Sequence, residues 1–452
     1  MIDIILVGDP KKSKIKRFSK MVFSLEGLFA IFVFPLTTGV YTGLPISVAK
    51  FAFALSVLIV IWKIATGKID LRKLPWVPII LFVAFAGYII LNGWPLKWGY
   101  PQKKAEVFAA YTAWSFLGAI LILNTREKVA RFLMISIWIT AVLGGLGLIG
   151  FVTGFQVLYD PNAVAEGRAA VGVGNPIVLA RAANSAILIL AWMFLQANRQ
   201  SKNTPNLLVL LIYFAIMVIA SGSRGPAVGC VIAGGFLFVC SSFSPKAAAR
   251  SFQLGLIVLI AGLAVTTVVS NTEKFDKVVD RIGELLIEGS RTTTFEYRRD
   301  AWELAYENFR ESPATGHGIG GFKSVNYGTS TYFPEQRIYP HNIVWELLCE
   351  AGLVGLLLFV CLHISVIKLL FGRKQSDNGF ATSLQGIAFA LWLFYFINAL
   401  SSGDLNDNRI MFCMLGLTAN SAAWSKVEKK NTRQSLRSIG SVQSATTMYP
   451  HA

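Results

Sequence analysis

The chain has 452 residues, of which 54% are apolar and only 15% are charged, and its formal net charge is +17. Soluble domains contain about 25% charged residues, so this composition excludes an ordinary soluble enzyme. The apolar residues gather in runs close to the ~20 residues that a helix needs to cross a bilayer core. The sequence therefore predicts an all-α, polytopic membrane protein surrounded by membrane lipids.

Twelve such runs follow one another along the chain. The first comes after a basic segment, residues 1–20, and no small-residue cleavage site follows it, so this segment is expected to remain as a cytoplasmic N-terminus. The predicted spans are 21–38, 44–65, 75–93, 106–124, 129–152, 176–197, 206–222, 224–242, 252–270, 342–371, 383–400 and 409–425.

The connections between these spans alternate in charge. One set is rich in Lys and Arg, whereas the other, which includes "TGVYTG" (38–43) and "SSGDLNDN" (401–408), is neutral or acidic. Because cytoplasmic loops carry the excess of Lys and Arg, both termini are predicted to be cytoplasmic, including the polar tail 426–452. The same rule explains the net charge without a nucleic-acid partner.

One predicted outside loop, residues 93–106, breaks this pattern. It carries Lys97, Lys103 and Lys104 on the side where basic residues are not expected. Binding of an anionic substrate would explain them, and chance would explain them equally well.

Two predicted outside segments are longer than a turn. The first is a periplasmic loop, 153–175, within the nine spans of 21–270. The second is a partly helical periplasmic cap, 271–341, ahead of the last three spans in 342–425. Within the cap, Phe295–Glu311 has apolar residues at helical spacing and is followed by a proline, so an amphipathic helix is predicted there.

The stretch "GHGIGGF" (316–322) matches G-x-G-x-x-G, but a helix is predicted before it and no strand. A dinucleotide fingerprint requires that strand, so we expect these glycines to allow a tight turn or a close approach to another surface. The four histidines are scattered and the five cysteines form no C-x-x-C pair. No metal, disulfide frame or cofactor is predicted.

Three arginines are candidates for an anion site. Arg181 lies inside the sixth span, where an unpaired charge costs at least ~2.5 kcal/mol; it either faces a cavity or partner, or is held at the interface or by a helix-end carbonyl. Arg224 begins the eighth span among small residues, and could bind a ligand or simply reach the interface. Arg298 lies four residues before Trp302, so it shares the apolar face of the predicted cap helix; a bound anion and a structural carboxylate are equally good partners.

His341 stands where the cap meets the tenth span, in "IYPHNIVWELLCEAG". An imidazole there could exchange a proton near neutral pH, or it could serve only as a helix cap or interfacial residue. Glu346 and Glu350 lie one turn apart on the helix that follows, and pairing with arginines of neighbouring helices is expected for them.

The long outside segment with "YRRDAWELAYENFRESPATGHGIGGF", followed by "PHNIVWELLCEAGLVG" opening a span, resembles the O-antigen ligase and polysaccharide polymerase superfamily of bacterial inner-membrane proteins. The resemblance implies a membrane glycosyltransferase fold of type C. It also implies metal-independent transfer of a glycan from undecaprenyl diphosphate to an acceptor hydroxyl on the periplasmic face of the inner membrane.

The resemblance also suggests roles for individual residues. His341 matches the histidine of the family's HN pair and would be the catalytic base. Arg298 and Arg224 match arginines that would bind the diphosphate, Arg181 is a weaker match, and Arg168 matches by position only. Glu-Tyr-Arg stands at 296–298 where the family frequently has Ser-Gly-Arg, which leaves Arg299 as an alternative to Arg298.

The first interpretation is an O-antigen ligase whose acceptor is lipid A–core. A polymerase of the same superfamily, with a second lipid-linked repeat unit as acceptor, shares the donor chemistry, and a third class of members glycosylates protein hydroxyls. A secondary transporter is the alternative from another class, and it would favour an inverted repeat and broken helices near the midplane. No repeat is evident, and the candidate residues gather at one predicted face.

Overall fold

The computed structural model describes residues 19, 21–34, 36, 47–93, 99–153, 169–171, 175–196, 204–241, 293–323, 339–372 and 383–423. All regular secondary structure within these residues is helical, which confirms the predicted all-α class. Five helices are long and apolar enough to cross a membrane, namely Val48–Ala65, Tyr100–Ile122, Arg126–Thr153, Pro176–Leu195 and Ile343–Phe371. The chain is therefore a membrane protein, while the total of twelve spans stays a prediction.

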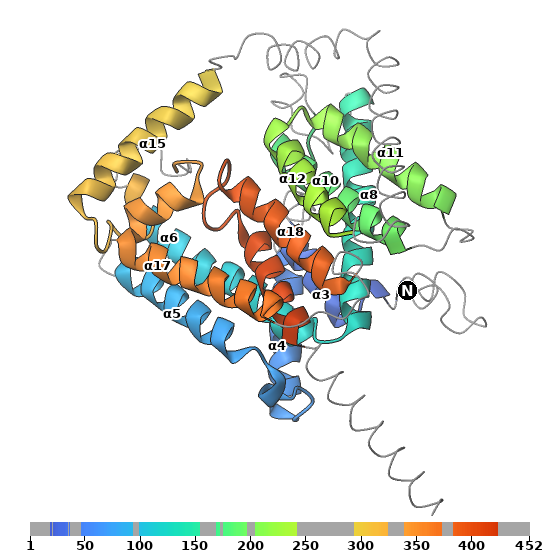
Figure 1. The fold of residues 1–452 in the computed structure, drawn as a ribbon, viewed down its shortest axis with the longest axis horizontal. Helices are drawn as coiled ribbons and strands as arrows, with labels where there is room; N and C mark the ends of the chain where they lie inside the picture. The colour runs from blue at the N-terminus through green and yellow to red at the C-terminus, as the bar shows by residue number, and fades with distance from the viewer. Residues whose placement is uncertain are drawn as a thin grey trace, which may run out of the picture.

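Most helices coincide closely with the predicted spans, whereas the fourth begins at Tyr100 and not at 106. Figure 1 shows their arrangement. They are α3 (Leu25–Val33), α4 (Val48–Ala65), α5 (Trp76–Gly93), α6 (Tyr100–Val107), the π-helix η3 (Phe108–Thr112), α7 (Ala113–Ile122), α8 (Arg126–Thr153), α10 (Pro176–Gln196), α11 (Thr204–Ser221), α12 (Arg224–Ser241), α17 (Ile343–Phe371), α18 (Leu384–Ala399) and a helix at 409–423. The first is shorter than the predicted 21–38. It starts later because Ser24 caps it and accepts a hydrogen bond from the amide of Gly27 at 3.2 Å, and it ends at Val33. The predicted ninth span, 252–270, lies outside the described residues.

The core of the bundle consists of large aromatic side chains from helices distant in sequence. Phe82 and Phe85 of α5 stack against Phe116 of α7 and Phe412, with ring centroids 4.2 and 6.2 Å apart respectively. All four rings are fully buried. Exposed apolar side chains such as Val83, Leu91 and Val231 cover the outside of the bundle, as expected where lipid is the solvent.

The amphipathic cap helix is confirmed as α15 (Thr293–Glu311), which starts two residues before the predicted boundary. Figure 1 shows it beside the start of α17, away from the main bundle. Its buried residues Ala301 and Ala305 pack with Phe322 and Cys349 in a small separate cluster. The helix is thus attached to the membrane part through its apolar stripe.

The glycine-rich turn after α15 is hydrogen-bonded to α17 at the point where that helix is interrupted. Gly352 has φ 61° and ψ −164°, which interrupts the helix. The carbonyl of Cys349 accepts from the amide of His317 at 2.9 Å, and the amide of Leu353 donates to the carbonyl of Pro313 at 2.9 Å. A Cβ at Gly316 would lie 2.5 Å from the backbone of Glu350, so this turn approaches α17 as closely as predicted.

We call the end of the bundle near α15 the α15 end. There α5 finishes, and α6, α10, α12 and α17 begin. At this end Asn92 of α5 donates to the carbonyls of Thr315 and Glu350, at 2.6 and 3.2 Å. The candidate site residues meet here.

Candidate functional site

His341 stands directly before α17 in a strained backbone conformation. It is the single described residue other than glycine with positive φ, at 56°. The helix is capped by its neighbour Asn342, whose Oδ1 accepts from the amides of Val344 and Trp345 at 2.9 and 3.3 Å. The alternative of His341 as the helix cap is therefore wrong, and the strain is of the kind that clusters at functional sites.

Aromatic residues from two segments position the imidazole. The ring of Tyr339 lies 4.3 Å from that of His341 between centroids, and Tyr297 of α15 meets it edge-on at 6.0 Å. The indole of Trp302 donates to the carbonyl of Pro340 at 2.8 Å, which ties the segment before His341 to α15.

The surroundings of His341 keep it neutral. Burial lowers its pKa from 6.5 to about 4; the positive charge of Arg298 acts in the same direction and Asp404 opposes it. Its Nδ1 is buried without a hydrogen-bond partner among the described residues. The ring therefore has a polar atom without a partner among the described residues, and it is in the unprotonated form that a general base requires.

Arg298 and Arg299 differ clearly in their surroundings. Arg298 is half-buried, close enough to His341 and Arg181 to affect both electrostatically, and burial lowers its pKa. Arg299 points outward and is 56% exposed, with Asp300 and Glu303 each 3.6 Å away. Of the two, Arg298 faces the site.

Arg181 is 7% exposed and faces the interior of the bundle. Its Nη2 donates to the carbonyls of Asn398 and Ser402 at 3.1 and 2.8 Å, at the end of α18. Its Nη1 lies 3.4 Å from the side-chain oxygen of Asn408, and its Nε has no partner among the described residues. The helix-end alternative thus accounts for part of this guanidinium.

Arg224 and Ala169, the residue after Arg168, both lie near the α15 end of the bundle. Arg224 is half-buried at the start of α12, and the next residue, Gly225, lies against Ser401, since a Cβ there would be 3.4 Å from its hydroxyl. Arg168 lies outside the described residues, but the amide of Ala169 donates to the carbonyl of Ala220 at 2.7 Å, near the turn before Arg224.

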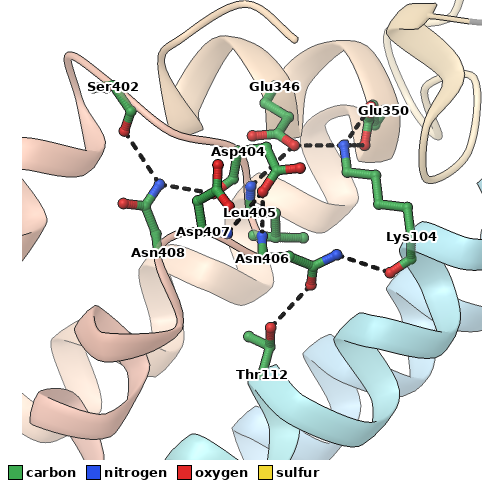
Figure 2. A network of polar contacts seen from close by, with 10 residues as sticks. All are labelled: Lys104, Thr112, Glu346, Glu350, Ser402, Asp404, Leu405, Asn406, Asp407 and Asn408. Carbon is green, nitrogen blue, oxygen red and sulfur yellow. Dashed lines mark hydrogen bonds and ion pairs between the residues drawn. The ribbon is translucent and has the colours of Figure 1, made fainter. Parts of the chain in front are cut away.

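Glu346 and Glu350 pair with a lysine, so the expectation of arginine partners was wrong. Lys104 Nζ lies 2.5 Å from Glu346 Oε1 and 2.8 and 2.7 Å from the two oxygens of Glu350 (Figure 2). All three side chains are at most 4% exposed. One basic residue of the 93–106 loop is thus neutralised by protein carboxylates, because α6 begins at Tyr100 and carries Lys104 into the bundle.

The segment that sequence analysis treated only as a short neutral or acidic connection, the 401–408 loop, lies at the centre of this network. Asp404 Oδ1 accepts from the amides of Asn406 and Asp407 at 2.9 and 2.7 Å, which folds the loop into a tight turn. The amide of Leu405 donates to Glu346 Oε1 at 3.1 Å. The repeated Asp and Asn residues in a connection between two spans were the available signal for this turn.

The arrangement combines charge with a proton acceptor. Guanidinium groups bind phosphate oxygens with charge-assisted, bidentate hydrogen bonds, and a neutral imidazole accepts a proton from a hydroxyl. The described residues contain no group of three or more His, Cys, Asp or Glu side chains that could hold a metal ion.

Fold and site together define an all-helical membrane protein with a cationic, histidine-containing site at one end of its bundle. A family model described as O-antigen ligase matches residues 208–360, which include α11, α12, α15 and the start of α17. This match and the relatives below support the resemblance to the O-antigen ligase superfamily that the sequence motifs predicted.

Individual relatives agree with this assignment. An O-antigen ligase of Pseudomonas aeruginosa is 24% identical over 320 residues, 68% of this chain and 68% of the relative. A candidate polysaccharide ligase of Rickettsia conorii is 26% identical over 227 residues, and the match spans 48% of this chain and about half (51%) of that relative. Another from Rickettsia felis is 21% identical over 322 residues, 65% of this chain and 74% of the relative.

Proposed function

We propose that this protein is an O-antigen ligase, a glycosyltransferase that moves a glycan from undecaprenyl diphosphate to a sugar hydroxyl of lipid A–core. Its site would face the periplasm from the bacterial inner membrane, and the transfer would need no metal ion. The ligase names of the relatives support this choice over a polymerase or a transporter. The observation that carries the proposal is the position of His341, whose Nδ1 has no partner among the described residues, against Tyr297, the neighbour of Arg298 on α15.

The arginines serve the donor in this proposal. The leaving group is a lipid diphosphate, whose negative charge increases as the glycosidic bond breaks. Arg298 and Arg224 bind the diphosphate, and Arg168, which lies outside the described residues, is a further candidate by its position in the sequence. Arg181, whose Nη2 is already bonded to two backbone carbonyls, contributes positive charge to the site without binding the diphosphate through that nitrogen. Fixed cations of this kind stabilise developing charge without reorganisation.

His341 serves the acceptor. The attacking sugar hydroxyl must lose its proton as the new glycosidic bond forms, and the imidazole takes that proton. A histidine that remains neutral beside Arg298 is available for this step even when the diphosphate site is occupied. The aromatic contacts of Tyr339 and Tyr297 hold its ring in place.

The experiment that tests this function is deletion of the gene in its host, followed by analysis of surface glycan. Loss of all attached polymer, restored by the wild-type gene and not by a His341→Ala gene, is the result expected for a ligase. A single attached repeat unit would instead identify a polymerase. Unchanged surface glycan, together with no transfer by purified protein supplied with a lipid-linked donor, would contradict both and favour the transporter.

A further inference from the structure

The 401–408 loop is anchored on one side by α6 and η3. The side chain of Asn406 donates to the carbonyl of Lys104 at 2.9 Å and accepts from the hydroxyl of Thr112 at 2.9 Å. Lys104 and Thr112 are eight residues apart, about 2.2 turns of an α-helix. The π-turn of η3 absorbs one extra residue, so that both positions face the loop.

The loop is anchored on its other side by α17. Glu346 Oε1 accepts from the amide of Leu405, at 3.1 Å, and from Lys104. Glu346 lies five residues after His341 on the helix that His341 precedes. The same carboxylate oxygen therefore fixes the loop relative to the helix that follows the proposed base (Figure 2).

Arg181 depends on this loop for its own position. One of the two carbonyls that hold its Nη2 belongs to Ser402, and Asn408, near its Nη1, donates to the carbonyl of Asp404 at 2.8 Å. A shift of the loop would therefore move Arg181 relative to His341. Displacements of about 1 Å away from the reacting atoms can cost roughly 10²-fold in rate.

We propose that Glu346 is a positioning residue of the transferase: its bond to the Leu405 amide sets the 401–408 loop, and through it Arg181, relative to His341. Lys104, which also binds Glu350, keeps the buried Glu346 carboxylate in place and offsets part of the negative charge of the pair. The proposal rests on the proposed function for its activity readout, whereas the anchoring of the loop can be measured without substrate.

Two triple variants isolate the hydrogen bond from the charge. The oxygen-retaining variant, Lys104→Met, Glu346→Gln, Glu350→Gln, is uncharged and keeps a side-chain oxygen at position 346 for the Leu405 amide. The oxygen-free variant, Lys104→Met, Glu346→Leu, Glu350→Gln, is equally uncharged and lacks that oxygen. Neither leaves a charge at these three positions, the buried Asp404 keeps its two amide donors, and replacement of a buried ion cluster is often tolerated, so both are expected to fold.

We expect the oxygen-retaining variant to transfer glycan within about threefold of the wild type, and the oxygen-free variant to lose roughly 10²-fold in kcat/KM. Hydrogen exchange at the Leu405 amide should accelerate only in the latter. Arg181→Lys should cost less in the oxygen-free background than in the oxygen-retaining one, because coupled residues are not additive. Equal activity of the two triple variants, or additive losses with Arg181→Lys, would overturn the proposal.

Thr112→Val provides a second test that changes no charge and hardly any volume. It removes the hydroxyl bond to Asn406, so faster exchange in the 401–408 loop and a several-fold loss of kcat/KM are expected. Unchanged exchange and rate would show that the loop is not set by its anchors. If the wild type transfers nothing, the proposed function fails, and the exchange rates still decide whether Glu346 anchors the loop.

Discussion

At the scale of single residues, His341 combines a strained backbone with a neutral ring whose Nδ1 has no hydrogen-bond partner among the described residues. If it is the general base, His341→Ala should lower the transfer rate by roughly 10²- to 10⁴-fold while donor binding persists. The measurement is single-turnover transfer from a lipid-linked donor with matched protein amounts. Because Asn342 and not His341 caps α17, the helix should remain intact, and thermal unfolding checks this. A near-wild-type rate would remove the base role.

The pH dependence of transfer follows from the lowered pKa of His341. An ordinary histidine would be protonated, and inactive as a base, below about pH 6.5. With a pKa of about 4, the ring stays neutral, so we expect kcat/KM to remain constant down to about pH 5 and then to fall. An inflection near pH 6.5 that disappears in His341→Ala would contradict the lowered pKa.

The cause of this shift can be tested as well. Arg298 lowers the pKa of His341 by its charge, so in Arg298→Gln the inflection of the residual activity should move to higher pH.

The lowered pKa of His341 also makes the stability of the fold depend on pH. The unfolded state, with a histidine pKa near 6.5, binds the proton first, so the protein should lose stability as the pH falls from 6.5 toward 4.

Arg298 and Arg299 form a matched pair for testing diphosphate binding. Lysine loses the bidentate geometry of arginine, so Arg298→Lys should lower kcat/KM roughly 10- to 100-fold, the range for lost hydrogen bonds to a charged group. Arg299→Lys should change it by less than about threefold, because exposed ion pairs contribute little. Equal effects of the two changes would argue against Arg298 as the donor ligand.

At the scale of elements, apolar periodicity predicted the helices well. The limits of α5, α10, α12, α15 and α18 lie within two residues of expectation, because apolar length and amphipathic spacing are properties of a single segment. Contacts between segments were not predictable in the same way. Lys104 and Glu350 are 246 residues apart, and neither spacing nor charge shows which helices meet.

The same division applies to the candidate site: features within one helix were predictable, and contacts between helices were not. The inward orientation of Arg298 followed from its spacing to Trp302 on one helix face. The carbonyls that hold Arg181 and the turn built by Asp404 could not be predicted, since they depend on how α10 and α18 pack. The π-turn at η3 was missed because its residues, "FAAYT", have no distinctive sequence signal.

The contact between the glycine-rich turn and α17 should contribute to stability and to the attachment of α15. At Gly352, φ is +61° and a Cβ would lie 2.4 Å from the carbonyl oxygen of Ala314. Gly352→Ala should therefore destabilise the protein by at least ~1–3 kcal/mol and make α15 more sensitive to protease. Gly235→Ala in α12, where nothing lies within 4 Å, is the control and should be neutral or stabilising. Similar melting curves for both variants would contradict the role of this contact.

At the scale of the molecule, the ends of the helices constrain how the chain crosses the membrane. Gly225 at the start of α12 and Arg181 in α10 both contact the 401–408 loop, and Glu346 at the start of α17 binds the same loop. Since α12 and α17 both begin at the α15 end, we predict an odd number of crossings between them. The predicted ninth span satisfies this requirement.

The orientation of the whole bundle can be tested by cysteine labelling. Lys and Arg predominate in the connections away from the α15 end, for example Arg72 and Lys73 between α4 and α5, which predicts that this side faces the cytoplasm. In a variant without its five native cysteines, Glu303→Cys on the exposed face of α15 should react with an impermeant maleimide from the periplasm. Lys73→Cys, whose side chain is 61% exposed, should react only after the inner membrane is opened. The reverse pattern would place the arginines and His341 in the cytoplasm, where a periplasmic glycan donor could not reach them.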